Sequence, residues 1–191
     1  MLLVDDQWTS LFDGRTLEGW KRTAFAGAGD VEVKDGRIVA SMGAALTGVN
    51  YTNQIPKVNY EVELDAMKVD GSDFFCALTV PVKDSFCTFI VGGWGGGVVG
   101  ISSVDGNDAS MNETTKFGSF DPGRWYHIRL RVTEKRIQTW IDQDKMVDLD
   151  TTGRKISMRY GEIEMSEPFG LATWVTTAAW KNIRIRAMKP E

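Results

Sequence analysis

The sequence predicts an all-β domain, built as a two-sheet antiparallel jelly-roll sandwich. Three observations support this prediction. Apolar and polar residues alternate with a period of two in many short segments, as they do in strands that bury one face. Turn-forming residues separate those segments, which is typical of sandwiches and barrels. The helical spacing of apolar residues, at three and four positions, is almost absent.

The clearest strand patterns lie in two segments. Residues 59–66 read NYEVELDA, in which every second residue is apolar. Residues 125–133 repeat the pattern, with His127, Arg129 and Arg131 on the polar face. The acidic residues of the first segment can pair with the arginines of the second if the two strands are neighbours. The other candidate strands, in chain order, are 31–34, 37–41, 74–80, 86–91, 98–103, 136–142, 145–149, 169–175 and 181–187.

Short turn sequences connect these strands, and no linker divides the chain. The turns include Lys34-Asp35-Gly36, Val69-Asp70-Gly71, Asp121-Pro122-Gly123 and Asp142-Gln143-Asp144. A chain of 191 residues fits one domain, which we place at residues 1–191. Residues 11–20 and 180–188 also have strand-like composition, and we expect the two segments to pair and so to protect sheet edges.

The charge and hydropathy of the chain exclude several classes of partner. The net charge is −4 and the pI is near 5.1, whereas nucleic-acid binding needs a basic surface. No apolar run approaches the ~20 residues of a membrane helix. Residues 1–10 have neither the basic start nor the apolar stretch of a signal peptide. The protein is therefore expected either in the cytoplasm or, after removal of an export signal, in the periplasm or outside the cell.

Cysteine and histidine are too sparse to predict a metal site. Cys76 and Cys87 both lie in apolar, strand-like runs, and we expect two buried free thiols. The chain has no CxxC pair, and His127 is its one histidine. No metal and no other cofactor is predicted from these residues.

Several long segments resemble one known family. LFDGRTLEGW at 11–20, VEVKDGRIVA at 31–40, the segment 123–150 and PFGLATWVTTAAWKNIRIR at 168–186 are similar, in this order, to the 3-keto-disaccharide hydrolase domain family. The resemblance implies the concanavalin A-like lectin/glucanase fold and a relation to family-16 glycoside hydrolases. It also implies a glycoside hydrolase that acts on di- or oligosaccharides, including 3-keto-glycosides. The alternatives are a non-catalytic carbohydrate-binding module and a structural or protein-binding sandwich, because one fold hosts many functions.

Glycoside hydrolysis needs two carboxylates beside the scissile bond, and the segment GEIEMSEP at 161–168 offers a candidate pair. On a strand, Glu162 and Glu164 would project from one face, about 7 Å apart. Glu167 could join them if a bulge shifts the phase. The spacing is similar to the acidic motif of family-16 glucanases. The alternative interpretation is a solvated strand edge or loop.

The loop at 102–115 is rich in oxygen-bearing side chains. Asp105, Asp108 and Glu113 follow a glycine-rich strand and could contact sugar hydroxyls. Carboxylate and amide oxygens also suit calcium, although the spacing does not match the calcium-loop pattern. The composition is equally that of an ordinary turn.

Aromatic residues supply the remaining candidates for carbohydrate binding. Trp140 is expected on the polar face of its strand, beside Arg129 and Arg131 if the two strands form a hairpin, where its ring could stack on a sugar. Trp94 is flanked by glycines, which mark a place where a ligand or another backbone approaches closely. Trp174 stands near the last strands, where members of the family commonly have a histidine. Each ring has the alternative of packing against its own protein.

Overall fold

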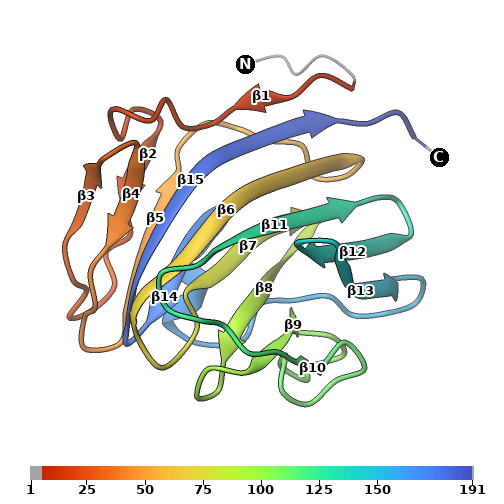
Figure 1. The fold of residues 1–191 in the computed structure, drawn as a ribbon. Coiled ribbons are helices and arrows are strands. Elements are labelled where there is room, and N and C mark those ends of the chain that lie inside the picture. The colour runs from red at the N-terminus through yellow and green to blue at the C-terminus, as the bar shows by residue number, and fades with distance from the viewer. Residues whose placement is uncertain (1–5, 191) are drawn as a thin grey trace.

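The computed structural model describes residues 6–190 and consists of two antiparallel β-sheets packed face to face (Figure 1). The predicted all-β sandwich is therefore confirmed. Between residues 6 and 190, the helical structure is limited to one short 3-10 helix, η1 (Glu162–Ser166). Within the same range, no helix is long and apolar enough to cross a membrane.

The eight-stranded sheet has the order β13-β12-β11-β6-β15-β4-β3, and β1 also pairs with β15. Its strands are β1 (Thr9–Ser10), β3 (Val31–Lys34), β4 (Arg37–Ala40), β6 (Tyr60–Gly71), β11 (Trp125–Val132), β12 (Arg136–Ile141), β13 (Asp144–Asp150) and β15 (Thr176–Ala187). The long strands β6 and β15 pair along most of their length and form the centre of this sheet.

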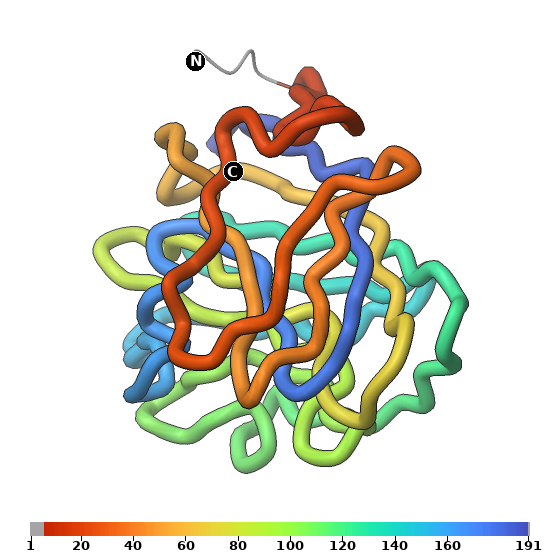
Figure 2. The backbone as a smooth tube through the Cα atoms, turned by 90° about the vertical axis from the view of Figure 1, so that its left-hand side faces the viewer, coloured from red at the N-terminus to blue at the C-terminus, as the bar shows by residue number. Residues whose placement is uncertain are grey.

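The seven-stranded sheet has the order β10-β9-β8-β7-β14-β5-β2. Its strands are β2 (Trp20–Arg22), β5 (Leu46–Tyr51), β7 (Cys76–Val82), β8 (Ser85–Gly93), β9 (Val98–Ser102), β10 (Lys116–Phe117) and β14 (Gly170–Trp174). Every strand range predicted from the sequence overlaps a strand of one sheet or the other. Figure 2 faces the edge that the early strands β2 to β5, in red and orange, form on both sheets.

The predicted pairing of the two ends of the chain holds only at the start of the first segment. Strand β1 pairs with β15, and the N–H of Leu11 donates to the carbonyl of Ile183 at 2.8 Å. The rest of residues 11–20 turns away, and Trp20 pairs with Tyr51 in the other sheet. The first segment therefore contributes to both sheets.

The main core fills the space between the sheets. Alternate residues of β11 and β8 face it, and each fully buried aliphatic side chain there contributes roughly 1.5–3 kcal/mol. The prediction of two buried free thiols is confirmed for Cys76 and Cys87. Burial raises the pKa of both thiols, that of Cys87 to about 12. The thiols are therefore inert packing groups.

Strand β5 was not predicted, because its sequence LTGVNY lacks alternation. All six residues are buried, so both faces of the strand are covered. A β-carbon at Gly48 would lie 2.4 Å from the carbonyl oxygen of Leu171, and only glycine allows this close approach of two strands. A strand buried on both faces gives no period-two signal.

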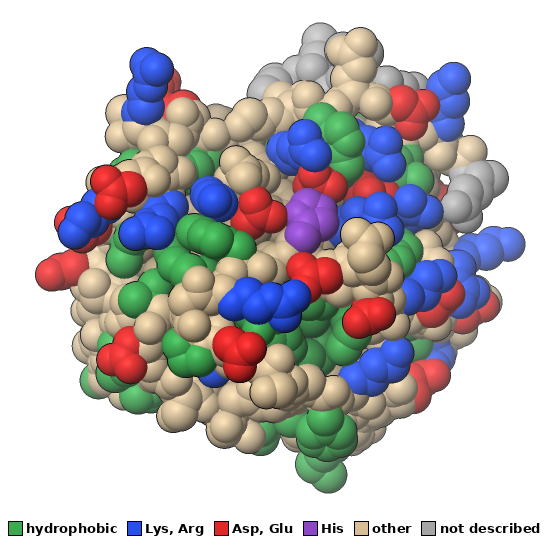
Figure 3. All heavy atoms as spheres, viewed as in Figure 1, with side chains coloured by type: hydrophobic (Ala, Val, Ile, Leu, Met, Phe, Trp, Pro, Cys, Tyr) green, Lys and Arg blue, Asp and Glu red, His purple; other side chains and the backbone are tan. Residues whose placement is uncertain are grey.

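The polar face of β6 is covered, not solvated as alternation alone would suggest. Glu61 is 0% exposed and accepts a hydrogen bond from Arg131 at 2.8 Å, with Arg186 at 3.4 Å and Arg129 at 3.8 Å. The predicted pairing between these strands is thus confirmed. Figure 3 shows this outer face, where His127, in purple, lies among acidic and basic side chains.

Candidate functional site

A second apolar cluster lies on the outer face of the seven-stranded sheet. In β8, Phe89 and its alternate neighbours face the main core, so Thr88 and Ile90 point to the opposite side. The cluster consists of Phe25, Leu46, Ala77, Ile90, Val98, Ala109 and Ala172, with Ala28, Phe74 and Ile163 packed against it. An outer sheet face that is apolar and partly open provides the floor of a ligand site.

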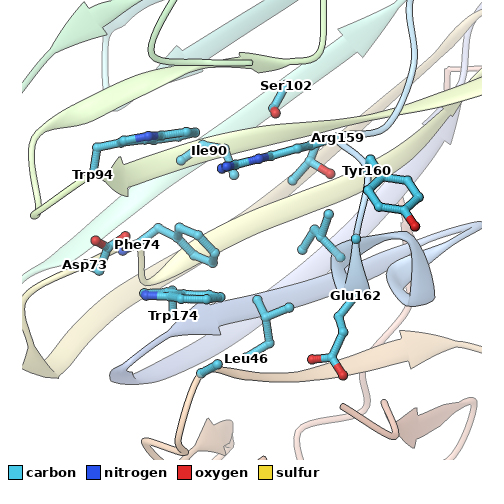
Figure 4. Close-up of a pocket in the computed structure, with 14 residues that line it drawn as sticks. Leu46, Asp73, Phe74, Ile90, Trp94, Ser102, Arg159, Tyr160, Glu162 and Trp174 are labelled. Atoms are coloured by element: carbon cyan, nitrogen blue, oxygen red, sulfur yellow. Dashed lines mark hydrogen bonds between the residues drawn. The ribbon is translucent and has the colours of Figure 1, made fainter. Parts of the chain in front are cut away.

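A pocket of about 480 Å³ opens over this floor (Figure 4). It extends across β5, β8, β9 and β14, with one wall from the turn after β8 and another from the segment around η1. The lining residues are Ala45, Leu46, Asp73, Phe74, Thr88, Ile90, Trp94, Ser102, Arg159, Tyr160, Gly161, Glu162, Ile163 and Trp174. The volume falls within the ~300–1,000 Å³ of small-molecule sites.

Aromatic rings dominate the open part of the pocket. Trp94 is 40% exposed and Trp174 is 41% exposed, which is unusual for the largest apolar side chain. The ring of Phe74 supports that of Trp174, with 6.5 Å between the ring centroids. Figure 4 shows Trp94 on one side of the pocket and Trp174 with Phe74 on the other. Such exposed ring faces suit the apolar face of a pyranose.

The glycine-rich turn presents Trp94 to the pocket. Gly92 and Gly96 have φ values of 82° and 111°, a region that favours glycine. A β-carbon at Gly96 would also lie 3.0 Å from the carbonyl oxygen of Ser72. Asp73 anchors the turn, because its Oδ2 accepts the N–H of Gly95 at 2.8 Å. The close backbone approach expected of the glycines is therefore present at this turn, and a ligand platform at Trp94 stays a prediction.

Two charged side chains complete the lining. Arg159 extends toward Trp94, with 5.4 Å between the guanidinium carbon and the ring centroid. Its ion pair with Asp108 is long, at 3.9 Å. Glu162 lies on the far side of the pocket from Asp73 (Figure 4), and its Oε1 is 3.4 Å from the N–H of Ala26.

The predicted strand geometry of the acidic segment is wrong. Residues 162–166 form the 3-10 helix η1, in which a step of two residues rotates the side chain by about 240°. Glu162 lines the pocket, whereas Glu164 turns back to accept the N–H of Gly161 at 3.2 Å. Burial, together with the charge of Glu164, raises the pKa of Glu167. The shared strand face on which catalysis by Glu162 and Glu164 was predicted is therefore absent. Catalysis by these residues stays a prediction.

The acidic loop at 102–115 makes mainly internal contacts. Asp105 accepts the backbone N–H of Lys155 at 2.8 Å and the Nε of Arg154 at 2.6 Å, and these bonds lower its pKa. Glu113 pairs with the same arginine. Within residues 6–190, no three His, Cys, Asp or Glu side chains gather closely enough to hold a metal ion. The calcium alternative stays a prediction.

Trp140 lies on the opposite side of the molecule from the pocket. The predicted hairpin between β11 and β12 is confirmed, and the guanidinium carbon of Arg129 sits 4.1 Å from the centroid of the Trp140 ring. Arg131 and Lys145 approach the same ring at 5.4 and 5.5 Å. The structure therefore brings Trp94, Trp174 and Glu162 together and separates them from the Trp140 group.

Sequence reasoning missed part of the lining: Asp73, Phe74, Thr88, Ile90, Ser102, Arg159 and Tyr160. Alternation in 86–91 contains the signal for Thr88 and Ile90, because it places them opposite Cys87 and Phe89. The residues around Arg159 lie in an irregular segment, MRYG, where no periodicity predicts the direction of a side chain.

The family comparison covers nearly the whole chain. A model of the family described as the 3-keto-alpha-glucoside-1,2-lyase-like domain matches residues 7–186. This match agrees with the resemblance read from the sequence segments.

One curated relative is a glycosidase. An extracellular exo-alpha-L-arabinofuranosidase from Streptomyces chartreusis is 27% identical over 149 residues, which is 72% of this chain and 18% of that protein. The chain thus spans less than a fifth of this curated relative.

Solved structures share the fold at low identity. The carbohydrate-binding module CBM66 from Bacillus subtilis has a TM-score of 0.58 at 15% identity, covering 88% of this chain and 96% of that one. The Crh5 transglycosylase has a TM-score of 0.62 at 12% identity, covering 96% of this chain and 85% of that one. These similarities establish the sandwich fold and leave the function to the site itself.

Proposed function

We propose, on the premise that this chain belongs to the 3-keto-alpha-glucoside-1,2-lyase-like domain family, that its outer-face pocket binds carbohydrate. The observation that carries the proposal is the pair of exposed tryptophans, Trp94 and Trp174, that line one pocket. Between two rings, the apolar face of a sugar is removed from water while its hydroxyl groups remain free to bond.

The pocket also offers polar groups at its back. Thr88 and Ser102 are register partners on β8 and β9, so their hydroxyl groups lie on the same sheet face. Arg159 adds the one basic group among the lining residues. A small number of polar groups around an apolar floor is the usual composition of a site that orients a small ligand.

The carboxylates of the pocket favour binding over cleavage. Asp73 uses both oxygens for backbone N–H groups, of Phe74 at 2.8 Å and of Gly95 at 2.8 Å. Glu162 is then the lining carboxylate that remains available. Hydrolysis by a carboxylate pair needs a second one, about 5–5.5 Å away for retention or ~6.5–9.5 Å for inversion. A carbohydrate-binding domain is therefore the function that the geometry supports best.

Cleavage is the second candidate, and Glu162 is the residue that favours it. The family description names a 1,2-lyase of 3-keto-α-glucosides, and elimination from such a sugar needs one base. The ketone acidifies the C2 proton; as the base takes that proton, the C2–H electrons form a C1=C2 double bond and the C1–O bond breaks. The aglycone oxygen leaves with the electrons of that bond and takes up a proton from the protonated base or from water. Glu162 has only a 3.4 Å contact with the Ala26 N–H, so it is free to act as that base.

One panel of sugars tests both candidates. Binding and turnover of neutral glycosides, acidic glycosides and 3-keto-glucosides would be measured with the wild type, Trp94→Ala, Trp174→Ala and Glu162→Gln. Trp140→Ala is the matched control, since it removes the same ring from the opposite sheet. We expect binding that both pocket variants weaken and the control preserves.

The outcomes separate the candidates. Turnover that disappears in Glu162→Gln while binding persists would replace the binding module with a lyase or hydrolase. If no sugar binds, or if Trp140→Ala abolishes binding while the pocket variants retain it, the pocket is not the carbohydrate site.

A further inference from the structure

We propose that the part of the pocket around Arg159 and Ser102 is a subsite for an anionic substituent of the sugar, a carboxylate or a sulfate ester. The inference rests on the proposed function, because it assumes that a sugar occupies the pocket. It adds a substrate class, namely acidic sugars, and two residues that select it.

The guanidinium of Arg159 is available to a ligand. Its side chain is 56% exposed, and its ion pair with Asp108 spans 3.9 Å. The other oxygen of Asp108 accepts the N–H of Ser110 at 2.9 Å and its hydroxyl at 2.6 Å, so Asp108 is held by its own loop. Its guanidinium carbon lies 5.4 Å from the centroid of the Trp94 ring, and the side chain lines the pocket. A planar guanidinium held in this way can bind a carboxylate through two parallel hydrogen bonds.

Within residues 6–190, the ion pair of Arg159 is with Asp108, and neither carboxylate of the pocket lining pairs with the guanidinium. Asp73 is engaged by two backbone N–H groups, which offset its charge locally. Glu162 lies across the pocket from the guanidinium (Figure 4).

The hydroxyl group of Ser102 independently indicates a place for a ligand oxygen. Its side chain is 2% exposed, and its Oγ has no hydrogen-bond partner within residues 6–190. Buried hydroxyl groups without a partner are uncommon in native structures. The neighbouring Thr88 hydroxyl already contacts Thr79 at 2.8 Å and the Met158 sulfur at 3.5 Å. The free Oγ of Ser102 can thus donate to an anionic oxygen that Arg159 holds.

Matched pairs of sugars test the subsite. Calorimetric affinities would be compared for methyl glucuronide against methyl glucoside, for methyl galacturonide against methyl galactoside, and for a 6-sulfated glucoside. The proteins would be the wild type, Arg159→Gln, Ser102→Ala and Arg136→Gln. The last is a control that removes an arginine from the opposite sheet. Circular dichroism would verify that each variant folds.

We expect the wild type to bind at least one acidic sugar about tenfold more tightly than its neutral parent, as a charge-assisted contact predicts. Arg159→Gln should remove this preference, Ser102→Ala should reduce it, and Arg136→Gln should leave it unchanged. Raising the salt concentration should weaken the preference in the wild type.

Two results distinguish this inference from the proposed function. Equal affinity for acidic and neutral sugars, or a preference that survives Arg159→Gln, overturns the anionic subsite while carbohydrate binding stands. Failure of the wild type to bind any sugar overturns both.

Discussion

The carboxylate of Asp73 accepts the N–H of Gly95 at 2.8 Å and so fixes the turn that carries Trp94. Its other oxygen accepts the N–H of Phe74 at 2.8 Å, and Phe74 supports the ring of Trp174. One side chain thus holds both aromatic walls of the pocket. Asp73 is a positioning residue, since it acts on the ligand through the two rings.

Replacing Asp73 should weaken sugar binding through the turn. Asp73→Ala removes both hydrogen bonds, and we expect affinity to fall about tenfold, because each lost charge-assisted bond frees part of the turn. Asp73→Asn keeps one acceptor oxygen and should have an intermediate effect. Calorimetry with the best sugar of the panel measures both variants.

Asp70→Ala is the control for this prediction. It removes a similar hydrogen bond, to the N–H of Gly71 at 2.9 Å, nearby in the chain without touching the Trp94 turn. Wild-type affinity in Asp73→Ala would contradict the positioning role, whereas equal losses in both variants would indicate a general loosening of the loop.

The sequence predicted the fold best where a strand has one buried face. Residues 125–133 alternate strictly, and the observed burial of β11 follows the same pattern. The same reasoning correctly placed Trp140 beside Arg129 in a hairpin. Local periodicity and turn chemistry were sufficient for these predictions.

The site was predicted less completely because it is assembled from segments without periodicity. Trp94 and Trp174 stood out as rings in unusual contexts, but alternation does not state which sheet face a ring shares with another. Glu162 follows Gly161, whose φ of 128° starts a 3-10 turn where a strand was expected. Arg159 and Ser102 come to line one pocket because Ser157, just before η1, pairs through its backbone with Ser103, just after β9, a tertiary arrangement without a local signal.

Glu61 should be a major determinant of stability. It is fully buried and faces three arginines, with Arg131 at 2.8 Å. Glu61→Gln leaves the arginines to repel one another, and we expect a loss of about 3 kcal/mol in the free energy of unfolding, within the range for breaking a buried pair. Urea denaturation of the wild type and Glu61→Gln measures this loss of stability.

Glu134→Gln is the matched control for Glu61, because its pair with Lys83 is long, at 3.9 Å, and exposed. It should change the free energy of unfolding by less than about 1 kcal/mol. Equal effects of the two substitutions would show that the arginine cluster does not depend on Glu61.

Asp148 should contribute to stability at acidic pH. Burial alone would raise its pKa, but hydrogen bonds from Arg136, Lys145 and Gln138 outweigh burial and lower the pKa to about 2. A lowered pKa stabilises the folded state above about pH 4, and this contribution is lost as the pH falls through about 2. Asp148→Asn should therefore flatten the decline of thermal stability between pH 4 and 2. A decline as steep as that of the wild type would contradict the prediction.

The buried thiols should make the protein less stable in alkali. The pKa of Cys87 rises from 9.0 to about 12 because burial disfavours the thiolate, and burial raises that of Cys76 as well. As the pH rises, the thiols of the unfolded chain ionise before those of the folded chain. The free energy of unfolding therefore keeps its full value below about pH 9 and falls as the pH rises toward 12. Each thiol should then cost about 1.4 kcal/mol per pH unit above pH 9.

Urea denaturation at pH 8 and at pH 10.5 measures this loss in the wild type and in the double variant Cys76→Ala/Cys87→Ala. The comparison uses the change with pH within each protein, because the alanines also leave cavities that lower stability at every pH. The double variant should lose less stability between the two values. It should retain some pH dependence, since burial also raises the pKa of Tyr60. Identical losses in both proteins would mean that the thiols become accessible to solvent before the chain unfolds.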